Sequence, residues 1–529
     1  MRLVQRREGK ERRLMKRMSV IPEPQSVTYQ PGCLTLTGDT AVKKASVKKV
    51  SDSGIAQEGY RMKISEDGIV IEASDEAGFF YGEKTLEQIR LQCGETLPCM
   101  EINDRPKYPY RSFHLDCVRH FIPVEELKKN IACAAAFKLN QFHWHFSDDQ
   151  GYRIESEVFP LLTAVGARRK EGNFGGKEGD EAESRYYTKQ EVRDVIAFAK
   201  EHFVEIVPEI DMPGHVTAIL AAYPQLSCRG EKLEVAAKEG IFSDILCAGK
   251  EETYAFMEKL LEELTGLFPG KYFHIGGDET PKTRWRECPF CREKMAEEGL
   301  RDEKELQGYL QNRIAAFLKK KGKRVIAWNE AALGDNLDPD IILQLWNDDP
   351  NDPAMKAFKM KDENGRFTSP NQGIGAKHIR KGGKVISSNM LLSYCDYPYA
   401  FVKSKAIFEA TMIPQKCGDI PDVGESVLGG EALCWTEHIR SMERLEYQIW
   451  PRYGIKADNL WSCSEENTFQ KFLRKEDLLE KIFEQYQIKA APRREYVPNV
   501  LTAGRQMLEF VKLLGKDNRG QYEEAHKQV

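Results

Sequence analysis

The chain has 529 residues, and its 78 Lys and Arg side chains against 82 Asp and Glu leave a formal charge of -4. Hydrophobic residues make up 41% and charged residues 30%, which excludes a disordered chain, a collagen-like fibre and a small disulfide scaffold. This balance of charge gives no reason to expect nucleic acid or a membrane as the partner, and the length predicts about two to four domains.

The amino terminus is basic, and no apolar run follows it, so it does not have the pattern of a secretory signal. We expect residues 1–18 to form a disordered leader. The thirteen cysteines cannot all pair with one another, because their number is odd. A reducing compartment is the simplest interpretation, and we expect a cytoplasmic location. Several cysteines lie in apolar runs, where a free thiol behaves as a small hydrophobic side chain: Cys117, Cys133, Cys247 and Cys434.

Three structural regions are expected after the leader. Residues 19–106 alternate short apolar runs with one helical pattern, which predicts a small non-catalytic α+β domain. Residues 107–465 alternate eight strand patterns with amphipathic helices, which predicts a (β/α)8 barrel of the TIM type. An open doubly wound sheet is the competing fold, but its Gly-rich phosphate turn is missing after the first strand. Residues 466–529 predict a C-terminal helical extension. The eight strand patterns are FHLDCV, QFHWHF, VEIVPEI, YFHIGG, RVIAWN, IILQLW, KVISSN and SVLGGEALCW.

Carboxylates and aromatic residues follow almost every predicted barrel strand, at the edge where such barrels carry their catalytic groups. This combination is typical of a carbohydrate site, because sugar C–H faces pack on aromatic rings and hydroxyls need carboxylate and Arg partners. The strongest motif is FHIGGDET, in which two glycines permit a sharp turn directly before Asp278 and Glu279. Adjacent carboxylates can separate each other's pKa values, so that one stays protonated near neutral pH.

The chain resembles the β-N-acetylhexosaminidases of glycoside hydrolase family 20. The segments LDCVRHF, KLNQFHWHFSDDQGYRIE, VPEIDMPGH, AAYPQLSC and YFHIGGDETP carry the resemblance, with AWNEAAL, SYCDYPY and ALCWTEH more loosely. They occur in the family's order over roughly residues 110 to 465, and IPEPQSVTYQPG and AGFFYGEKTLEQI resemble the family's N-terminal domain.

The resemblance implies a retaining exo-glycosidase that removes terminal β-linked N-acetylglucosamine or N-acetylgalactosamine with the substrate's own acetamido oxygen as nucleophile. Glu279 would be the general acid/base, Asp278 would orient the acetamido group, and Tyr394 would donate a hydrogen bond to its oxygen. The other residues assigned by resemblance are Trp328, Trp346 and Trp435 around the sugar, Arg119, Asp396 and Glu437 at its hydroxyls, and His215 with Asp148 as a pair supporting Glu279.

The sequence departs from the family pattern at three places. Tyr152 stands where Trp is common, and Asn329 in WNEA removes a charge beside the pocket. The polar segment 349–384 is long and could shape subsites beyond the terminal sugar. A glycan is the expected partner, and a homodimer is compatible with the sequence. We expect no cofactor and no metal.

Several alternatives stay open. Within the family, a lacto-N-biosidase or a 6-sulfo-N-acetylglucosaminidase fits the same motifs. Outside it, His143, His145, His215, His274 and Asp278 echo the ligand order of metal-dependent amidohydrolase barrels, although the amidohydrolase pattern places its last His and Asp on different strands. A CxxC motif, CPFC at residues 288–291, lacks the two further ligands that a zinc site needs, so we expect a purely structural role for it.

Overall fold

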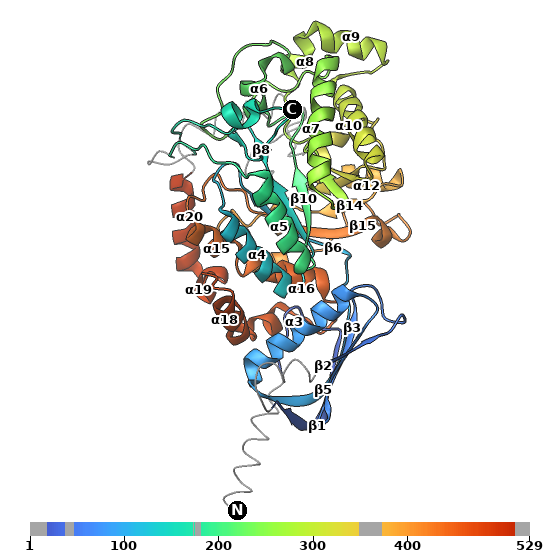
Figure 1. Cartoon of the computed structure of the whole chain (residues 1–529), viewed down its shortest axis with the longest axis vertical. Helices are drawn as coiled ribbons and strands as arrows, with labels where there is room; N and C mark the ends of the chain where they lie inside the picture. Colours follow the sequence, from blue (N-terminus) through green and yellow to red (C-terminus); the bar gives the residue numbers. More distant parts are fainter. Residues whose placement is uncertain (1–17, 37–46, 173, 175–180, 349–372, 514–529) are drawn as a thin grey trace, which may run out of the picture.

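The computed structural model describes residues 18–36, 47–172, 174, 181–348 and 373–513 (Figure 1). The expected leader, apart from its last residue, and residues 349–372 of the polar segment lie outside these residues. Among the described residues, no helix is both long and apolar enough to cross a bilayer.

The N-terminal domain is a five-stranded sheet with one helix packed on it. The strand order is β1-β5-β3-β4-β2. The Asp75 side chain begins helix α3 by accepting a hydrogen bond from the Gly78 N–H. The helix then buries Phe79, Leu86 and Ile89 with the apolar side chains of the sheet. The elements are β1 (Ser26–Thr35), β2 (Val47–Ser51), β3 (Tyr60–Ser65), β4 (Gly68–Ala73), α3 (Glu76–Cys93) and β5 (Thr96–Asp104).

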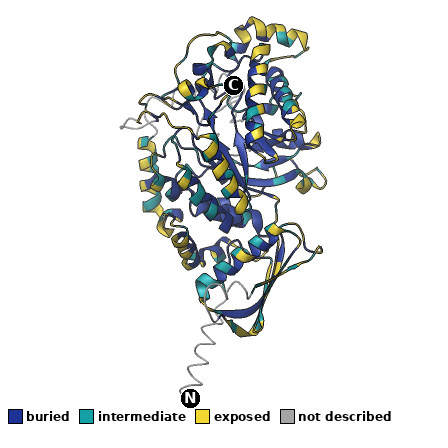
Figure 2. Ribbon diagram, in the orientation of Figure 1, coloured by how far each residue is buried: buried dark blue, intermediate teal, exposed yellow. Residues whose placement is uncertain are grey.

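Eight parallel strands close into a barrel, which confirms the predicted TIM-barrel fold and all eight strand patterns. These strands are buried along nearly their whole length, as the dark blue centre of Figure 2 shows. Strand β10 pairs with both β7 and β11, and β15 closes the barrel against β6. The strands are β6 (Tyr110–Asp116), β7 (Gln141–His145), β10 (Glu205–Glu209), β11 (Tyr272–His274), β12 (Arg324–Trp328), β13 (Ile342–Leu345), β14 (Val385–Ser387) and β15 (Val427–Ala432).

Two kinds of layer fill the barrel. An apolar cluster of one side chain from each of six strands lies nearer the strand starts. A polar layer follows, in which Glu431 accepts hydrogen bonds from Ser112 and Gln344 and contacts His143. The barrel helices bury their apolar faces in a separate, larger core. They include α4 (Val124–Ala136), α5 (Lys189–Glu201), α7 (Glu251–Leu267), α10 (Glu303–Lys320), α12 (Ile374–Arg380), α14 (Ser404–Phe408) and α16 (Arg452–Trp461).

A further group of helices lies in the C-terminal part of the chain, and all but the first of them begin beyond residue 465, where the sequence predicts a helical extension. Figure 1 shows them in red along one side of the barrel, reaching towards the N-terminal domain. Lys84 in α3 donates a hydrogen bond to Tyr486, directly after α18, at 3.2 Å. These helices are α15 (Met442–Ile449), α17 (Phe469–Leu473), α18 (Glu476–Gln485), α19 (Arg493–Tyr496) and α20 (Val500–Leu513).

A buried ion pair joins the N-terminal domain to the barrel. The Lys138 ammonium, which follows α4, lies 2.9 Å from the Asp104 carboxylate at the end of β5. Tyr60 and Trp461 also donate hydrogen bonds to Asp104, at 2.8 and 2.9 Å. All four side chains are almost completely buried, and Lys138 also lies over the Trp461 ring. A buried charge of this kind strongly destabilises the fold if its oppositely charged partner is removed.

Candidate active site

The turn after β11 has backbone angles that favour glycine. Gly276 and Gly277 have φ angles of 62° and 113°, in the region that favours glycine. A Cβ atom on Gly276 would lie 1.6 Å from Oδ1 of Asp211. The prediction that two glycines permit the sharp turn is confirmed, and the turn places Asp278 and Glu279 at the carboxyl edge of the barrel.

Helix α10 and the loop after β12 hold this turn in place. Gln307 donates a hydrogen bond to the Gly277 carbonyl at 2.6 Å, and Gln311 of the same helix donates to the Met212 carbonyl in the loop after β10 at 2.9 Å. The Glu279 N–H donates to the Glu330 carboxylate. Glu279 itself has a φ of 41°, which is rare for a residue with a side chain, so its position depends on these surrounding contacts.

His215 lies between the two carboxylates and a second acidic pair. Its Nε2 is 3.5 Å from Oε2 of Glu279 and 3.7 Å from Oδ2 of Asp278. Its Nδ1 is 3.1 Å from Asp149 and 3.3 Å from Asp148. Burial alone would lower the pKa of His215, but the carboxylates raise it well above its ordinary value. The ring is therefore an imidazolium that can donate from both nitrogens.

The structure adds Asp149 to the expected pair of His215 and Asp148. Asp149 makes the hydrogen bond to His215 Nδ1, and it also accepts from the Thr217 N–H and hydroxyl. Asp148 contacts His215 as well, but its Oδ2 binds Arg119 and His145. The two adjacent aspartates of the SDDQ motif are apparent in the sequence. The sequence alone does not show which of them hydrogen-bonds the His215 ring.

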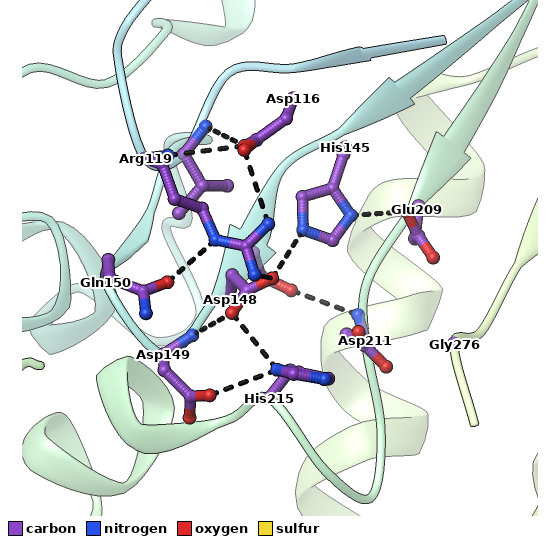
Figure 3. Close-up of polar contacts among 12 residues, drawn as sticks. Asp116, Arg119, His145, Asp148, Asp149, Gln150, Glu209, Asp211, His215 and Gly276 are labelled. Carbon is purple, nitrogen blue, oxygen red and sulfur yellow. Dashed lines mark hydrogen bonds and ion pairs between the residues drawn. The ribbon is translucent and has the colours of Figure 1, made fainter. Parts of the chain in front are cut away.

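Arg119 contacts several of these groups at once (Figure 3). Its guanidinium lies 2.7 Å from Asp148, 3.3 Å from Asp116 and 3.6 Å from Glu437. Its Nε donates to Gln150 at 2.8 Å. The guanidinium carbon also lies 5.2 Å from the centre of the Trp435 ring. Arg119 therefore joins the acidic groups behind His215 to the aromatic part of the site.

Four aromatic rings from four strand ends form one cluster, which we call the aromatic cage: Trp328, Trp346, Tyr394 and Trp435. Ring centres lie 6.1 Å apart for Trp328 and Trp435, and 6.4 Å apart for Tyr394 and each of Trp346 and Trp435. Trp328 is fixed by a hydrogen bond from its Nε1 to Glu209 at 2.8 Å. Rings at this spacing can pack against the faces of a flat, partly apolar ligand.

Three buried polar atoms near the cage have no hydrogen-bond partner among the described residues. They are Oδ1 of Asp278, Oδ1 of Asp396 and Nε1 of Trp346. Buried polar groups are normally paired, so such a group of unpaired acceptors and one donor marks a place for a polar ligand. Burial, and then the charges of Asp278 and Asp396, raises the pKa of Tyr394 well above its ordinary value, so its hydroxyl remains a donor.

The carboxyl groups of the site differ strongly in their titration. Burial is the main reason that the pKa of Asp278 rises to about 8; His215 opposes this rise, whereas Glu279 and Glu330 add to it. Burial and the Glu437 charge raise the pKa of Asp396 to about 7. Without a ligand, the pocket therefore disfavours negative charge on Asp278, although this carboxyl lies beside an imidazolium.

We expect Asp278→Asn to stabilise the fold, and to do so more strongly at higher pH. The folded protein keeps the Asp278 proton up to about pH 8, whereas the unfolded chain releases it near pH 4. The stability that comes from this proton is therefore lost as the pH rises through that range. Since an amide never ionises, the gain in free energy of unfolding should be about 3–4 kcal/mol larger near pH 8 than near pH 5.

Urea unfolding of the wild type and the variant at both pH values checks this. The control is Asp194→Asn on the exposed face of α5, which should change stability little at either pH. Equal effects of Asp278→Asn at the two pH values would show that the buried carboxyl does not titrate as stated.

Asn329, the residue that departs from the family pattern, joins two strand ends through its amide. Its Oδ1 accepts from the Trp346 N–H at 2.9 Å, and its Nδ2 donates to Asn347 at 2.8 Å. Asn347 in turn donates to Glu330, which accepts from the Glu279 N–H. A carboxylate at position 329 could not donate to Asn347, so the amide completes a chain of hydrogen bonds towards Glu279. Tyr152, the other exchange, is fully buried.

The histidines of the amidohydrolase alternative are occupied by carboxylates. His143 lies 3.2 Å from Glu209 and 3.1 Å from Glu431 through its two ring nitrogens. His145 contacts Glu209 and Asp148, and His274 lies 2.9 Å from Glu209. Burial alone would raise the pKa of Glu209, but these imidazoles lower it well below its ordinary value. The histidines thus form a buried charge network around Glu209.

Comparison with known proteins agrees with this geometry. Residues 108–464 match the model of the glycosyl hydrolase family 20 catalytic domain, and residues 43–105 match domain 2 of the same family. A β-hexosaminidase from Porphyromonas gingivalis is 35% identical over 433 residues, which are 80% of this chain and 53% of that protein. A β-hexosaminidase from Akkermansia muciniphila is 30% identical, over 86% of this chain and 88% of that protein. The chain thus spans about half the length of the first relative and most of the second.

Solved structures give the same result. The β-N-acetylhexosaminidase from Bacteroides fragilis superposes with a TM-score of 0.74 at 27% identity, over 89% of this chain and 97% of that one. A β-hexosaminidase mutant from Streptomyces plicatus, solved in complex with its product N-acetylglucosamine, superposes with a TM-score of 0.72 at 26% identity, over 90% and 97% of the two chains. Together with the barrel and its Gly-Gly-Asp-Glu turn, these matches show that the chain belongs to glycosyl hydrolase family 20.

Proposed function

We propose that the chain is a retaining exo-β-N-acetylhexosaminidase that uses the 2-acetamido group of its substrate as the nucleophile. One observation carries the proposal: the paired carboxyls Asp278 and Glu279 both lie within 3.7 Å of His215, beside an aromatic cage with unpaired polar atoms. A sugar ring with an acetamido substituent fits both parts, because it has apolar faces, a donor N–H and an acceptor carbonyl.

In the first step, Glu279 protonates the glycosidic oxygen as its bond to the anomeric carbon breaks. The acetamido oxygen attacks that carbon from the opposite side, and an oxazolinium ring forms while the leaving alcohol departs. Asp278 accepts the acetamido N–H and stabilises the positive charge that develops on nitrogen. Tyr394 donates to the acetamido oxygen and places it for attack.

In the second step, the Glu279 carboxylate takes a proton from water, whose oxygen attacks the anomeric carbon. The oxazolinium ring opens, the acetamido group is restored, and the sugar leaves with its original anomeric configuration. His215 acts through Glu279 and Asp278, because its imidazolium lies within 3.7 Å of both carboxyl groups and is itself held by Asp149. Proximity explains why a neutral amide can serve as the nucleophile.

A pair of chromogenic substrates tests the proposal. Wild-type protein should hydrolyse an aryl β-N-acetylglucosaminide with a kcat/KM roughly 10³-fold or more above that of the matching β-glucoside, which lacks the acetamido nucleophile. Comparable rates on the two glycosides would contradict the assignment of Asp278 and Tyr394 to the acetamido group.

The preferred sugar and leaving group are finer questions, and the same assay extends to them. A panel of β-linked N-acetylglucosaminides, N-acetylgalactosaminides, 6-sulfated sugars and disaccharide substrates would separate a general hexosaminidase from the two alternative specificities. The cytoplasmic location and the homodimer stay predictions.

A further inference from the structure

Four cysteines that are far apart in the sequence meet at one point outside the sugar site: Cys228, Cys247, Cys288 and Cys291. We call them the cysteine cluster. Their sulfur atoms all lie within 4.8 Å of one another. Three of the separations are 3.9 Å for Cys228 and Cys291, 3.7 Å for Cys247 and Cys288, and 3.6 Å for Cys247 and Cys291. The two further ligands that the CxxC motif lacks in the sequence are thus supplied by a distant loop.

These separations match a tetrahedral metal site. A zinc ion with four thiolates at about 2.3 Å requires sulfur atoms about 3.8 Å apart. A disulfide, in contrast, requires about 2.05 Å, and the thirteen cysteines, all among the described residues, are free. Simple packing of thiols as small hydrophobic groups gives no reason for four of them to converge on one point.

The backbone around the cluster is built to hold it. Ser227 pairs with Leu246 in an antiparallel bridge, and the Cys247 N–H donates to the Leu226 carbonyl at 2.8 Å. This closes the base of the loop whose two ends are Cys228 and Cys247. Lys250 donates to the Gln225 and Ser227 carbonyls at 2.9 and 2.7 Å and fixes the same base. The loop therefore presents its two thiols together.

The other two thiols come from the start of helix α9 (Pro289–Glu297), which follows α8 (Thr283–Glu287). Cys288 is the N-cap residue and Cys291 lies in the first turn, where the helix dipole favours negative charge. A Cβ atom on Gly249 would lie 2.2 Å from the Phe290 carbonyl carbon, so only glycine lets the loop approach the helix this closely. Trp285 adds a hydrogen bond to the Leu246 carbonyl at 2.9 Å.

We propose that the cysteine cluster binds one zinc ion with all four sulfurs. Four protein ligands fill the tetrahedral coordination, so the ion has no open position for water or substrate, and its role is structural. Cys228 is partly exposed while the other three are buried, which leaves a route for the metal to enter. Lys250 supplies a cation at the base of the loop, whereas Arg229 and Arg284 both bind Asp244 within the loop.

The position of the ion gives it a defined structural task. The loop of Cys228 and Cys247 follows β10 and the segment of His215, while α9 follows the turn of Asp278 and Glu279. Zinc would therefore clamp two barrel loops together just outside the residues that we assign to catalysis. This clamp goes beyond the proposed glycosidase activity and does not depend on it.

Zinc content and coordination of the full-length wild type test the proposal directly. Protein purified without chelators should contain about one zinc per chain by mass spectrometry of the metals. X-ray absorption at the zinc edge should show four sulfur neighbours at about 2.3 Å. Zinc below a tenth of an equivalent with four free thiols, a disulfide within the cluster, or iron in place of zinc would each overturn the proposal.

Variants then locate the ion. Cys288→Ser with Cys291→Ser should lose the zinc and melt at a lower temperature. The matched control, Cys33→Ser with Cys463→Ser, removes two exposed thiols and should keep the full equivalent. If the first variant does not fold, the X-ray absorption spectrum of the wild type still shows whether four sulfur atoms bind the zinc. Glu279→Gln should lose glycosidase activity and keep its zinc, so failure of the zinc proposal and failure of the proposed function are distinguishable.

Discussion

Glu279→Gln is expected to lower kcat/KM for an alkyl or weakly activated aryl β-N-acetylglucosaminide by about 10³-fold, within the usual range for loss of a general acid/base. Glutamine has nearly the same shape but can neither protonate the leaving oxygen nor take a proton from water. Because a good leaving group needs no protonation, the loss in the first step should be much smaller for a dinitrophenyl glycoside. Steady-state and burst-phase kinetics on the two substrates measure this difference.

The matched control is Glu287→Gln, an exposed residue in the neighbouring helix α8. It makes the same chemical change at the surface and should leave kcat/KM within about twofold, as surface substitutions usually do. Wild-type activity in Glu279→Gln, or the same loss for good and poor leaving groups, would contradict the role of Glu279 as the acid.

Asp278→Asn is expected to lower kcat/KM for N-acetylglucosaminides by about 10²–10³-fold, the usual loss for removing one preorganised electrostatic group. The amide cannot balance the positive charge that develops on the acetamido nitrogen. The slow hydrolysis of the corresponding glucoside, which develops no such charge, should change much less. The ratio of the two kcat/KM values should therefore fall by about the same factor as the N-acetylglucosaminide rate.

Two readouts on Asp278→Asn separate catalysis from folding. The variant should be more stable near pH 8 and less active, because the pocket disfavours the negative charge that the reaction needs. Asp194→Asn again serves as the control, with unchanged kinetics expected. A parallel loss on both glycosides would mean that Asp278 supports the shape of the pocket and has no special relation to the acetamido group.

The sequence predicts the barrel well, because each strand is a short apolar run followed by polar residues at its carboxyl end. The Gly-Gly turn was equally visible, since φ angles of 62° and 113° favour glycine locally. The candidate residues for the sugar site do gather at one edge, because parallel strands bring all their carboxyl ends together. Local patterns therefore predict both the fold and the region of the site.

Contacts made by side chains from distant segments could not be predicted in the same way. Nothing in the SDDQ motif shows that Asp149 hydrogen-bonds His215 while Asp148 binds Arg119, because the choice depends on rotamers set by packing. In the sequence, Asn329 is notable only because it lacks the charge of the family's usual carboxylate. In the fold, its amide donates a hydrogen bond to Asn347. The cysteine cluster is similar: Cys247 and Cys228 lie 41 and 60 residues before the CxxC motif, so spacing alone did not reveal the set.

The ion pair between Lys138 and Asp104 has a consequence for how the two domains fold. Cutting the chain near residue 106 would leave a buried ammonium in the barrel without its counter-charge, and the Trp461 indole without its acceptor. The barrel by itself is thus a destabilised fragment, although its sequence is contiguous. Heat or denaturant should unfold both domains in one cooperative transition, so damage to the small sheet would lower the amount of folded barrel.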